Sequence, residues 1–550
     1  MHTLHAPVRS EVRWRCLLRA SAVVFACVVT VAAQAQVQPQ EDPPGRVGRV
    51  AEAVGNARTI NAEGAWAALV RNQPLSTGDR VVTDKSGRAT LQFGSTSVRL
   101  GADSDVVVTQ LDDQKIRLHF DHGQMAVRVR SDDVLGELFV ETDEGAWVPH
   151  HPGQYRFDRA AAHQVLAAQA WTGDMLLEAP DSSLPVAAPQ RAEVWRAGAQ
   201  QATHYRLVPA VKDAFGDAVL AQDKIDDRQA VASATAQVPP EMTGAADLAR
   251  FGTWSVAPDG ARAWTPAKLP AGWQPFQRGA WSWMSPWGWT WIDDQPWGFA
   301  PFHYGRWRML QGHWAWTPGK WGKTRPVYAP ATVGWFGGPA LAVGDAPAVG
   351  WVALAPDEAV YPGYAVSAKY WNALNDASIT PPNRRAVAIQ GRARLVPTGP
   401  IAYANRGVPD ALTVVATSAL LPHVPVATLP GLRGAELRKP AIAERLGQAM
   451  VTPPPGAPVG HTALSATAAV VQVPVVAAKV GAPATGFKPV VAPVVAAGPA
   501  AKIAGADVSK PTPPVAPAPL AVARPIAPIA PVVAMKPITA PVPPAPMASR

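Results

Sequence analysis

The sequence predicts a mainly β protein with a first β region, one short helix, a Trp-rich antiparallel β domain and a long disordered tail. Three observations predict this arrangement. Short runs of alternating apolar and polar residues, separated by turn residues, continue from residue 45 to about 208, which is typical of a β sandwich, barrel or roll. Of the 21 tryptophans, 16 lie between Trp254 and Trp371. From residue 380 onward the chain is rich in Pro, Ala and Val.

Residues 1–35 are predicted to be a cleaved signal peptide, followed by a short leader at 36–44. Several arginines precede an apolar stretch from residue 20 to 33, and Ala33 and Ala35 place small residues where a signal peptidase cleaves. The apolar stretch is shorter than the roughly 20 residues that a membrane-spanning helix needs. We therefore expect a periplasmic protein with no stable membrane span after cleavage, and association with the outer membrane stays open.

Composition argues against several classes of site. Both cysteines, Cys16 and Cys27, lie in the predicted signal peptide, so we expect no disulfide, thiolate metal site or cysteine nucleophile. The formal net charge is +9, but no run of Lys and Arg indicates a nucleic-acid partner. The sequence has no Gly-x-Ser-x-Gly, His-Glu-x-x-His, Walker A or Gly-x-Gly-x-x-Gly motif. We therefore expect no enzyme, and no cofactor.

Residues 45–210 are predicted to form the first β region, in two halves at about 45–130 and 134–208. Residues 88–93 alternate between inward and outward positions, and residues 84–87 form the preceding turn. Strands recur about every 8–12 residues, and no helical periodicity interrupts them before residue 130.

Residues 211–240 are predicted to be a helical linker, with the helix itself at 212–232. At helical spacing, Phe215, Val219, Ile225 and Val231 share one apolar face. The acidic residues are then expected to occupy the remaining, polar positions; these are Asp213, Asp217, Asp223, Asp226 and Asp227.

Residues 241–371 are predicted to form the Trp-rich β domain. The frame Pro-Phe-x-x-Gly-x-Trp occurs at Pro275 and again at Pro301, so Gly279 and Gly305 are candidate structural residues. Several tryptophans are two residues apart, which places neighbouring indoles on one face of a strand. These rings form either a hydrophobic core or a face that stacks on sugars. The candidates for ligand contact are Trp287, Trp289, Trp291, Trp297 and Trp307.

Residues 380–550 are predicted to be a disordered tail. Between residues 451 and 550 there are seven Lys and Arg residues, and Asp507 is the single acid. Proline interrupts helices and sheet ladders, and Ala, Val and Pro bury too little apolar surface to offset the loss of chain entropy.

Gly48 to about Val129 resembles the FecR-like periplasmic module. The matching residues are mainly turn glycines and strand hydrophobes; they are Gly48, Trp66, Leu69, Asn72, Leu75, Gly78, Asp79, Val81, Thr83, Gly87, Ala89, Leu91, Phe93, Gly94, Ser95 and Leu100. Gly78-Asp79 and Gly94-Ser95 are expected to form turns. The best-known role of the family is to sense a loaded outer-membrane receptor and control a sigma factor. That role requires a cytoplasmic part and a spanning helix, so only the periplasmic module is carried over.

The segment from about Pro240 to Tyr370 resembles a Trp-rich exported domain of unknown function that often follows a FecR-like module in Gram-negative bacteria. The resemblance rests on five stretches of the sequence; they are Pro240–Gly244, Leu248, Phe251–Trp254, Pro286–Asp294 and Pro296–Trp307.

No residue cluster gives a convincing metal site. His150 and His151 are adjacent and would point to opposite faces of a strand, and the pair His119 and His122 is equally unspecific. The Asp293-Asp294 pair could bind calcium, but a turn in which Asp accepts local amide hydrogen bonds is the simpler interpretation. His303 and His313 are expected to hydrogen-bond within the fold, with a sugar as the alternative.

We expect a non-enzymatic periplasmic interaction or scaffold protein that acts in envelope maintenance or sensing. Its partner would be an envelope protein or a cell-wall glycan. Two alternatives stay open, namely a glycan- or peptidoglycan-binding module that uses the Trp face, and a signal-transduction regulator of FecR type.

Overall fold

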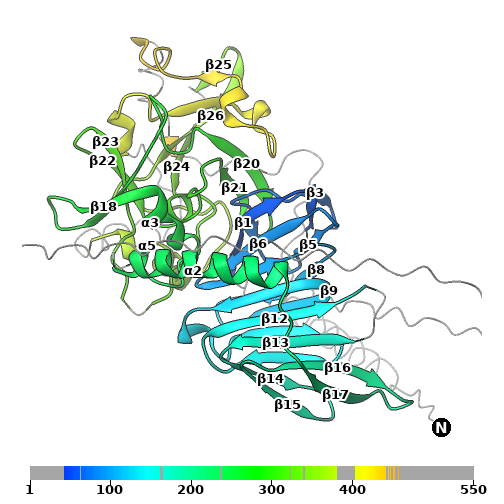
Figure 1. Ribbon diagram of the computed structural model, residues 1–550. Coiled ribbons are helices and arrows are strands. Elements are labelled where there is room, and N and C mark those ends of the chain that lie inside the picture. Colours follow the sequence, from blue (N-terminus) through cyan, green and yellow to red (C-terminus); the bar gives the residue numbers. More distant parts are fainter. Residues whose placement is uncertain are drawn as a thin grey trace, which may run out of the picture. The chain divides into compact units, whose positions relative to one another are not determined.

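The structure is a computed structural model that describes residues 42–61, 64–161, 165–235, 238–322, 324–337, 341–380 and 403–440, together with 442, 444, 446, 450, 451 and 456. The fold of these residues is mainly β, as the sequence predicts (Figure 1). The predicted signal peptide with Ala33 and Ala35, most of the leader and most of the tail lie outside the described residues. None of the described helices combines the length and the apolar character that a membrane span requires.

Strands β1 to β17 form two sheets that share strand β9. The pairing order of the first sheet is β4 (Pro74–Leu75), β1 (Gly48–Val54), β6 (Arg88–Phe93), β7 (Thr96–Leu100), β9 (Ile116–Val129), β12 (Gly153–Arg159), β13 (Leu166–Thr172), β16 (Arg191–Ala197) and β17 (Ala202–Val208). That of the second is β3 (Trp66–Ala68), β2 (Ala57–Ile60), β5 (Arg80–Thr83), β8 (Asp105–Leu111), β9, β10 (Leu138–Thr142), β11 (Gly145–Pro149), β14 (Asp174–Glu178) and β15 (Ser183–Ala187). Only the β9–β10 pair is parallel among these pairings.

Strand β9 can serve both sheets because it changes partners at a glycine. Its first part pairs with β8 and β10, and its second part pairs with β7 and β12. Gly123 lies between the two parts with a φ of +100°, and a Cβ there would come within 2.3 Å of the Ser104 backbone. Glycine alone tolerates both conditions. One hydrophobic core, with members from Val50 to Val194, therefore runs through both predicted halves.

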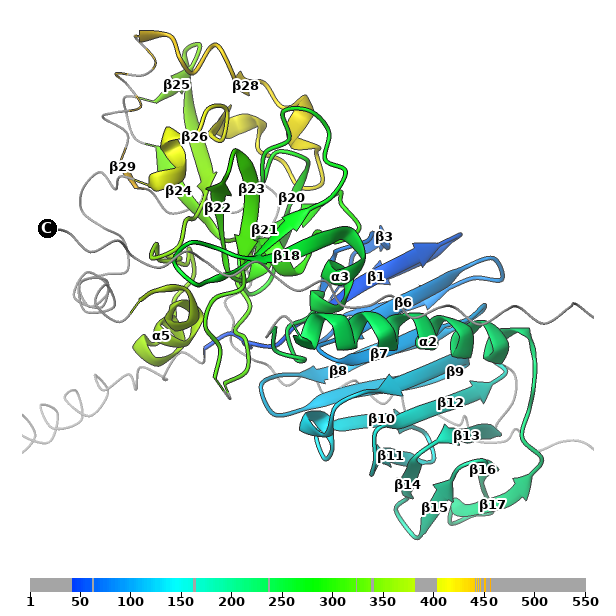
Figure 2. The same ribbon diagram turned by 60° about the vertical axis from the view of Figure 1, so that its left-hand side comes forward.

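Helix α2 (Ala214–Thr235) is close to its predicted place, but the face that it packs on the sheet contains Val219 together with Asp223 rather than Ile225 and Val231. Asp223, expected at a polar position, is 1% exposed, whereas Ile225 and Val231 are 39% and 67% exposed. Of the predicted apolar face, Val219 is buried. The expected apolar face is therefore wrong, because the sheet surface under α2 carries arginines that pair with the acidic residues. Figure 2 shows α2 lying over the first sheet, next to β6 and β7.

The Trp-rich region contains three small sheets. The first has the order β18 (Gly252–Val256), β19 (Arg262–Pro266), β23 (His313–Thr317) and β22 (Arg306–Leu310), and the second is the hairpin of β20 (Gly279–Met284) and β21 (Gly288–Asp293). The third has the order β28 (Gly431–Leu432), β27 (Thr413–Ala416), β26 (Ala346–Ala353), β24 (Val333–Gly337) and β29 (Met450–Val451). Strand β25 (Ala342–Val343) pairs with β26 outside this order. The short helices are α3 (Leu248–Phe251), α4 (Ala300–His303) and α5 (Ala368–Asn375). The 3-10 turns are η1 (Asp132–Val134), η2 (Ala245–Asp247), η3 (Asp376–Ser378), η4 (Ala404–Gly407), η5 (Thr417–Ala419) and η6 (Val426–Thr428).

The core of the Trp-rich region extends beyond its predicted end at residue 371. Strand β27 pairs with β26, and Val414 and Val415 are fully buried in the same core as the tryptophans. The prediction that the tail begins at residue 380 is therefore wrong for residues 403–440. A β-branched run at 413–415 supplies the buried surface, although the surrounding Pro- and Ala-rich composition hides it.

The tryptophans form this core. Trp281 and Trp291 are cross-strand neighbours in the β20–β21 hairpin, with ring centroids 5.3 Å apart in an edge-on arrangement. Several indole N–H groups donate to backbone carbonyls, for example Trp307 to Pro301 at 2.8 Å and Trp351 to Phe276 at 3.0 Å. Edge-on ring packing and, for several of these residues, a hydrogen-bonded indole N–H are typical of buried tryptophans.

The five indoles predicted to contact a ligand are all at most 3% exposed: Trp287, Trp289, Trp291, Trp297 and Trp307. They offer no face to a sugar ring. The ligand-contact hypothesis is therefore wrong for these residues, and the alternative reading, that the indoles are core, agrees with the structure.

We expect Trp297→Ala to lower the free energy of unfolding by about 3–5 kcal/mol, the usual cost of truncating a buried tryptophan. Trp297 stacks on Phe302 at 5.9 Å and meets Trp264 edge-on at 5.0 Å. Urea denaturation followed by circular dichroism measures the change. The control is Trp66→Ala, because Trp66 is 59% exposed and its truncation should cost less than about 1 kcal/mol. A W297A variant as stable as the wild type would contradict the core role.

Candidate binding groove

The turn at Gly94-Ser95, between β6 and β7, holds the segment that leads into the Trp-rich region. Ser95 Oγ donates to Glu241 Oε1 at 2.5 Å. The backbone N–H of Gly94 donates to Thr243 Oγ1 at 3.0 Å, and Thr243 Oγ1 in turn donates to the carbonyl of Val47 at 3.0 Å. Gly94 has a φ of +55°, and a Cβ there would lie 2.2 Å from Glu241 Oε2. Glycine is therefore required at this position for two reasons, the positive φ of the turn and the close approach of Glu241.

Asn72 makes a second connection between the two regions. Its side chain is fully buried, and Nδ2 donates to the carbonyls of Asp293 and Gln295 at 2.9 and 2.7 Å. Its φ of +63° is one that Asn tolerates better than most residues. The carboxylate of Asp293 accepts from Trp291 Nε1 at 3.0 Å and from the N–H of Gln295 at 2.9 Å, so it caps a turn. We call these contacts and those at Gly94-Ser95 the joint.

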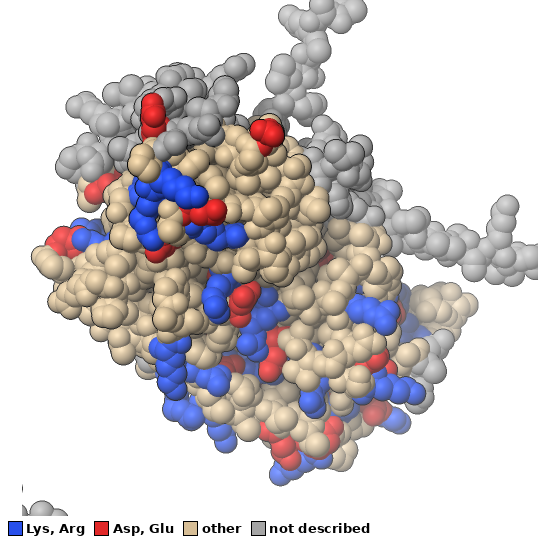
Figure 3. Space-filling view, turned by 90° about the horizontal axis from the view of Figure 1, so that it is seen from above, with Lys and Arg blue, Asp and Glu red and all other residues tan. Residues whose placement is uncertain are grey.

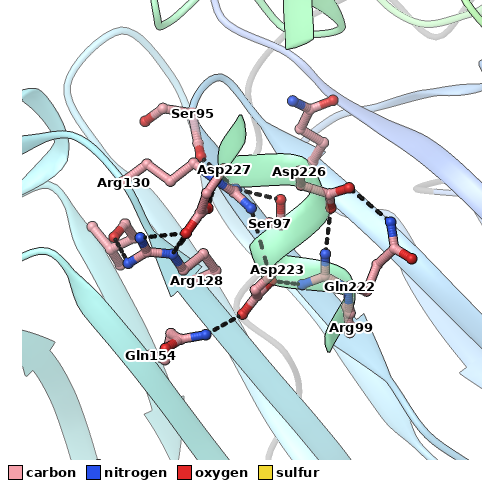
Figure 4. Close-up of polar contacts among 12 residues, drawn as sticks. Ser95, Ser97, Arg99, Arg128, Arg130, Gln154, Gln222, Asp223, Asp226 and Asp227 are labelled. Carbon is pink, nitrogen blue, oxygen red and sulfur yellow. Dashed lines mark hydrogen bonds and ion pairs between the residues drawn. The ribbon is translucent and has the colours of Figure 1, made fainter. Parts of the chain in front are cut away.

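The acidic face of α2 rests on arginines of the first sheet (Figure 4). Arg99, on β7, pairs with Asp223 and with Asp226, the latter at 2.5 Å. Arg128 and Arg130, from the end of β9, pair with Asp227 at 2.9 and 2.7 Å. We call these six residues the helix network.

Two further contacts extend the helix network. Gln154 Nε2 donates to Asp223 Oδ2 at 2.7 Å, and Arg156 pairs with Asp213, just before the helix, at 2.7 Å. Asp223 therefore accepts hydrogen bonds at both of its oxygens, as a buried carboxylate must.

The helix network fixes the charge state of its carboxylates. Burial alone would raise the pKa of Asp227, but Arg128 and Arg130 hold it below its ordinary value. Burial raises the pKa of Asp226, against the opposing effect of Arg99. Burial also lowers the pKa of Arg130, although Asp227 counteracts this. Asp227 therefore stays ionised near neutral pH and acts as the anchor of α2.

A groove of about 940 Å³ lies beside the helix network. Its floor is formed by residues of β1, β6 and β7, one wall by α2, and the other wall by η2 and α3. Arg71, Glu52 and Arg250 line it and are exposed, as is Val231 of α2. This volume lies within the range of ligand sites and suits an extended peptide segment of several residues.

Charges of both signs line the groove. Arg71 donates through Nε to the carbonyl of Ala51 at 3.1 Å, and Arg250 lies over the ring of Phe251 at 5.1 Å. On the face shown in Figure 3, Lys and Arg side chains likewise lie among Asp and Glu side chains rather than in one continuous patch. The groove therefore matches a ligand that carries both charges, such as a polypeptide.

The remaining predicted structural residues lie at turns or at the start of a strand. Gly78 has a φ of +94°, and Asp79 Oδ2 accepts from the N–H of Ser76 at 2.7 Å. A Cβ on Gly279 or on Gly305 would lie 2.3 or 2.2 Å from a carbonyl of the paired strand.

Of the histidines considered as ligands, His150 and His151 both approach Asp174, His150 Nδ1 at 3.7 Å from Asp174 Oδ2. His151 is exposed and pairs with Asp174, whereas His303 is fully buried and bonds through Nδ1 to the carbonyl of Ala329 at 2.8 Å. His313 is exposed on the Trp-rich region.

Among the described residues, one group has metal-ligand geometry: Asp105, Asp121 and His122. Arg80 already donates to both carboxylate oxygens of Asp105, and His122 Nδ1 lies 2.8 Å from Asp121 Oδ2. A guanidinium thus supplies the positive charge that a cation would bring.

The helix network does not stand out in the sequence. Two signals were present. Arg128 and Arg130 are two residues apart at the end of a strand and therefore share a face. Asp223, Asp226 and Asp227 follow helical spacing and therefore form an acidic stripe.

Part of this chain is similar to known proteins. Residues 245–358 match a family of unknown function, DUF6600, and this match lies within the predicted Trp-rich domain. Two crystal structures of a "putative anti-sigma factor" from Parabacteroides distasonis, at 2.50 and 1.65 Å resolution, are similar at 14% and 12% identity, each with a TM-score of 0.21. Each match covers 24% of this chain and 60% of the other. No curated protein sequence matches.

We expect Asp223→Asn to loosen α2, because it removes the charge that faces Arg99 in a buried ion pair. Loss of one partner of such a pair costs on the order of 3–5 kcal/mol. Amide hydrogen exchange of residues 214–235 measures the opening. Asp217→Asn is the matched control, because Asp217 lies on the same helix and is exposed. Equal exchange in both variants would contradict the anchoring role.

His303 should make the Trp-rich region sensitive to acid. Burial lowers the pKa of His303 to about 3, below the unfolded value of about 6.5. As the pH falls, the unfolded chain therefore binds the proton first. The stability that neutral His303 contributes is complete above about pH 6.5 and is lost as the pH falls toward 3. At pH 5.5 the loss from this residue is about 1.4 kcal/mol. Urea denaturation followed by Trp fluorescence measures the free energy of unfolding at pH 7.5 and at pH 5.5. The difference between the two values should be smaller in His303→Asn or His303→Gln than in the wild type. An equal difference would contradict this role of His303.

Proposed function

We propose that this chain is a non-enzymatic interaction protein of the bacterial cell envelope, and that the groove beside α2 binds a polypeptide segment of a partner protein. The observation that carries this proposal is the groove itself. The groove is lined by the first β region, by α2 and by the start of the Trp-rich region. The fold therefore places three segments that are distant in sequence around one opening. An interaction protein needs such a fixed concave surface.

The chemistry of the groove supports binding rather than proton transfer. Three of the five carboxylates that line it, Asp226, Asp227 and Asp247, are each paired with an arginine. A general acid or base needs a pKa near the working pH and access to a reacting atom, whereas Asp227 is held ionised by two guanidinium groups. We therefore propose that these charges position α2 and the walls of the groove.

A polypeptide partner is favoured over a glycan. The tryptophans that would have formed a sugar-stacking face are buried, whereas the groove offers charged groups of both signs. The envelope location rests on the predicted signal peptide. A regulator of FecR type is the narrower form of the same proposal, since such a regulator also acts by binding another protein.

Photocrosslinking in intact cells tests the proposal. A photoreactive residue at Val231, which is 67% exposed and lines the groove, should capture a protein. The matched control is Val256, which is 61% exposed and does not line the groove.

Arg71→Glu combined with Arg250→Glu should reduce the capture at Val231 by roughly tenfold or more, which corresponds to about 1.4 kcal/mol of binding free energy. Protein captured equally at both positions, or unaffected by the charge reversals, would show that the groove is not the binding site. Recovery of cell-wall glycan alone would overturn the polypeptide proposal.

A further inference from the structure

One face of the first sheet carries arginines on several strands. Arg99 on β7, Arg156 on β12 and Arg191 on β16 lie in one row across the sheet, because the directly paired residues between them keep the register. Such pairs point to one face of a sheet. Arg128 and Arg130, from the end of β9, point to the same face, since they lie two and four residues from the member of this row on β9. We call these five residues the arginine face, and each of their side chains is at most 20% exposed.

Most counterions of the arginine face come from α2 and the residue just before it. Among the described ion pairs, Asp158 is the sheet's own contribution, and it pairs with Arg156 and Arg191. The other carboxylates that pair with this face all belong to one segment of the chain; they are Asp213, Asp223, Asp226 and Asp227. Without this segment, five arginines would share one carboxylate. Guanidinium groups gathered in this way bind carboxylates well.

Charge, rather than an apolar stripe, attaches α2 to the arginine face. A surface helix normally buries its apolar stripe, but Ile225 and Val231 of α2 are exposed whereas Asp223 is buried. Asp223, Asp226 and Asp227 follow the i, i+3, i+4 spacing of one helix face. The arginines recognise carboxylates at this spacing, whichever helix carries them. The arginine face therefore fits a helix from another protein that has the same acidic stripe.

We infer that the arginine face is the docking surface for an acidic helical segment of the partner protein, and that α2 occupies this surface in the free protein. The inference deepens the proposed function and rests on it, because the partner makes its first contact in the groove. Arg99, Arg128 and Arg130 belong to the arginine face and also line the groove. The groove is therefore continuous with the interface that α2 already forms (Figure 4), and an incoming acidic helix can reach these three arginines from it.

Exchange of one acidic helix for the other conserves the ion pairs of the arginine face. A buried ion pair is costly to break when one charge stays unpaired, but the incoming carboxylates replace those that leave. Helix α2 keeps an advantage because it is tethered to the sheet, and a short tether gives an effective concentration on the order of millimolar. A free acidic helix is therefore a weak competitor, whereas a partner that also fills the groove gains an advantage of the same kind.

Fluorescence anisotropy with a peptide tests the inference. The probe is a labelled peptide with the sequence of residues 212–235, titrated with the full-length chain. The triple variant Asp223→Asn, Asp226→Asn, Asp227→Asn should bind it roughly tenfold more tightly than the wild type or better, because its own α2 competes less well. Asp217→Asn is the matched control, since Asp217 is exposed on the same helix, and it should bind the peptide as the wild type does. Equal binding by the triple variant and the wild type overturns the inference.

Two further measurements link this binding to the arginine face. Adding Arg99→Gln and Arg130→Gln to the triple variant should raise the dissociation constant by roughly tenfold or more. A peptide in which the same three aspartates are replaced by Asn should bind the triple variant as weakly, because it lacks the acidic stripe. Binding that survives the loss of both arginines places the peptide elsewhere and overturns the inference.

Amide hydrogen exchange of the wild-type chain tests the exchange of helices without any substitution. Unlabelled peptide at about 1–2 mM, comparable to the effective concentration of a tethered helix, should speed the exchange of the chain's own residues 214–235. The exchange of strands β20 and β21 should stay the same. A helix α2 that remains protected overturns the inference. The two proposals fail separately, because capture of a protein at Val231 in cells together with a protected α2 overturns this inference alone.

Discussion

The hydrogen bonds of the joint fix the first β region against the Trp-rich region, and the other features of the molecule depend on this constraint. Glu241 and Thr243 occupy the Gly94-Ser95 turn, and Asn72 binds two carbonyls of the turn after β21. Because these groups are buried, each would lose its partner if the two regions separated, and an unsatisfied buried polar group costs about 1–3 kcal/mol. The groove exists because its walls come from both sides of this joint.

Helix α2 lies beside the joint and is held mainly by charge. Its buried surface includes Gly216 and Asp223 together with Val219, so apolar packing supplies little of its attachment. A buried ion pair is expensive to form and more expensive to break. The helix network therefore gives α2 one defined position over the sheet, and that position sets the width of the groove.

The Trp-rich region is stabilised in a different way, by aromatic packing. Its indoles fill a core built from short strands and small sheets, because each large ring covers much surface with few degrees of freedom. Core continuity also brings residues 403–440 into the region through β27. The density of tryptophans that first suggested a binding surface is thus explained by the need to stabilise many short elements.

Much of the fold could be predicted from the sequence. The alternation of apolar residues determined the strands of both regions, and turn residues such as Gly78 and Gly94 marked their ends. The existence and position of α2 followed from its length and its terminating prolines. These features depend on local periodicity and backbone conformation, which the order of residues fixes directly.

Only the tertiary structure decided which surfaces meet. The sequence placed Phe215, Val219, Ile225 and Val231 on one face of α2, but only the fold showed that the arginines beneath the helix attract a face on which Val219 lies beside Asp223. It also could not distinguish a tryptophan core from a tryptophan surface, because the same spacing by two produces both. Burial and ion pairing depend on contacts between residues that are distant in sequence, such as Asn72 with Asp293, and local patterns contain no record of those contacts.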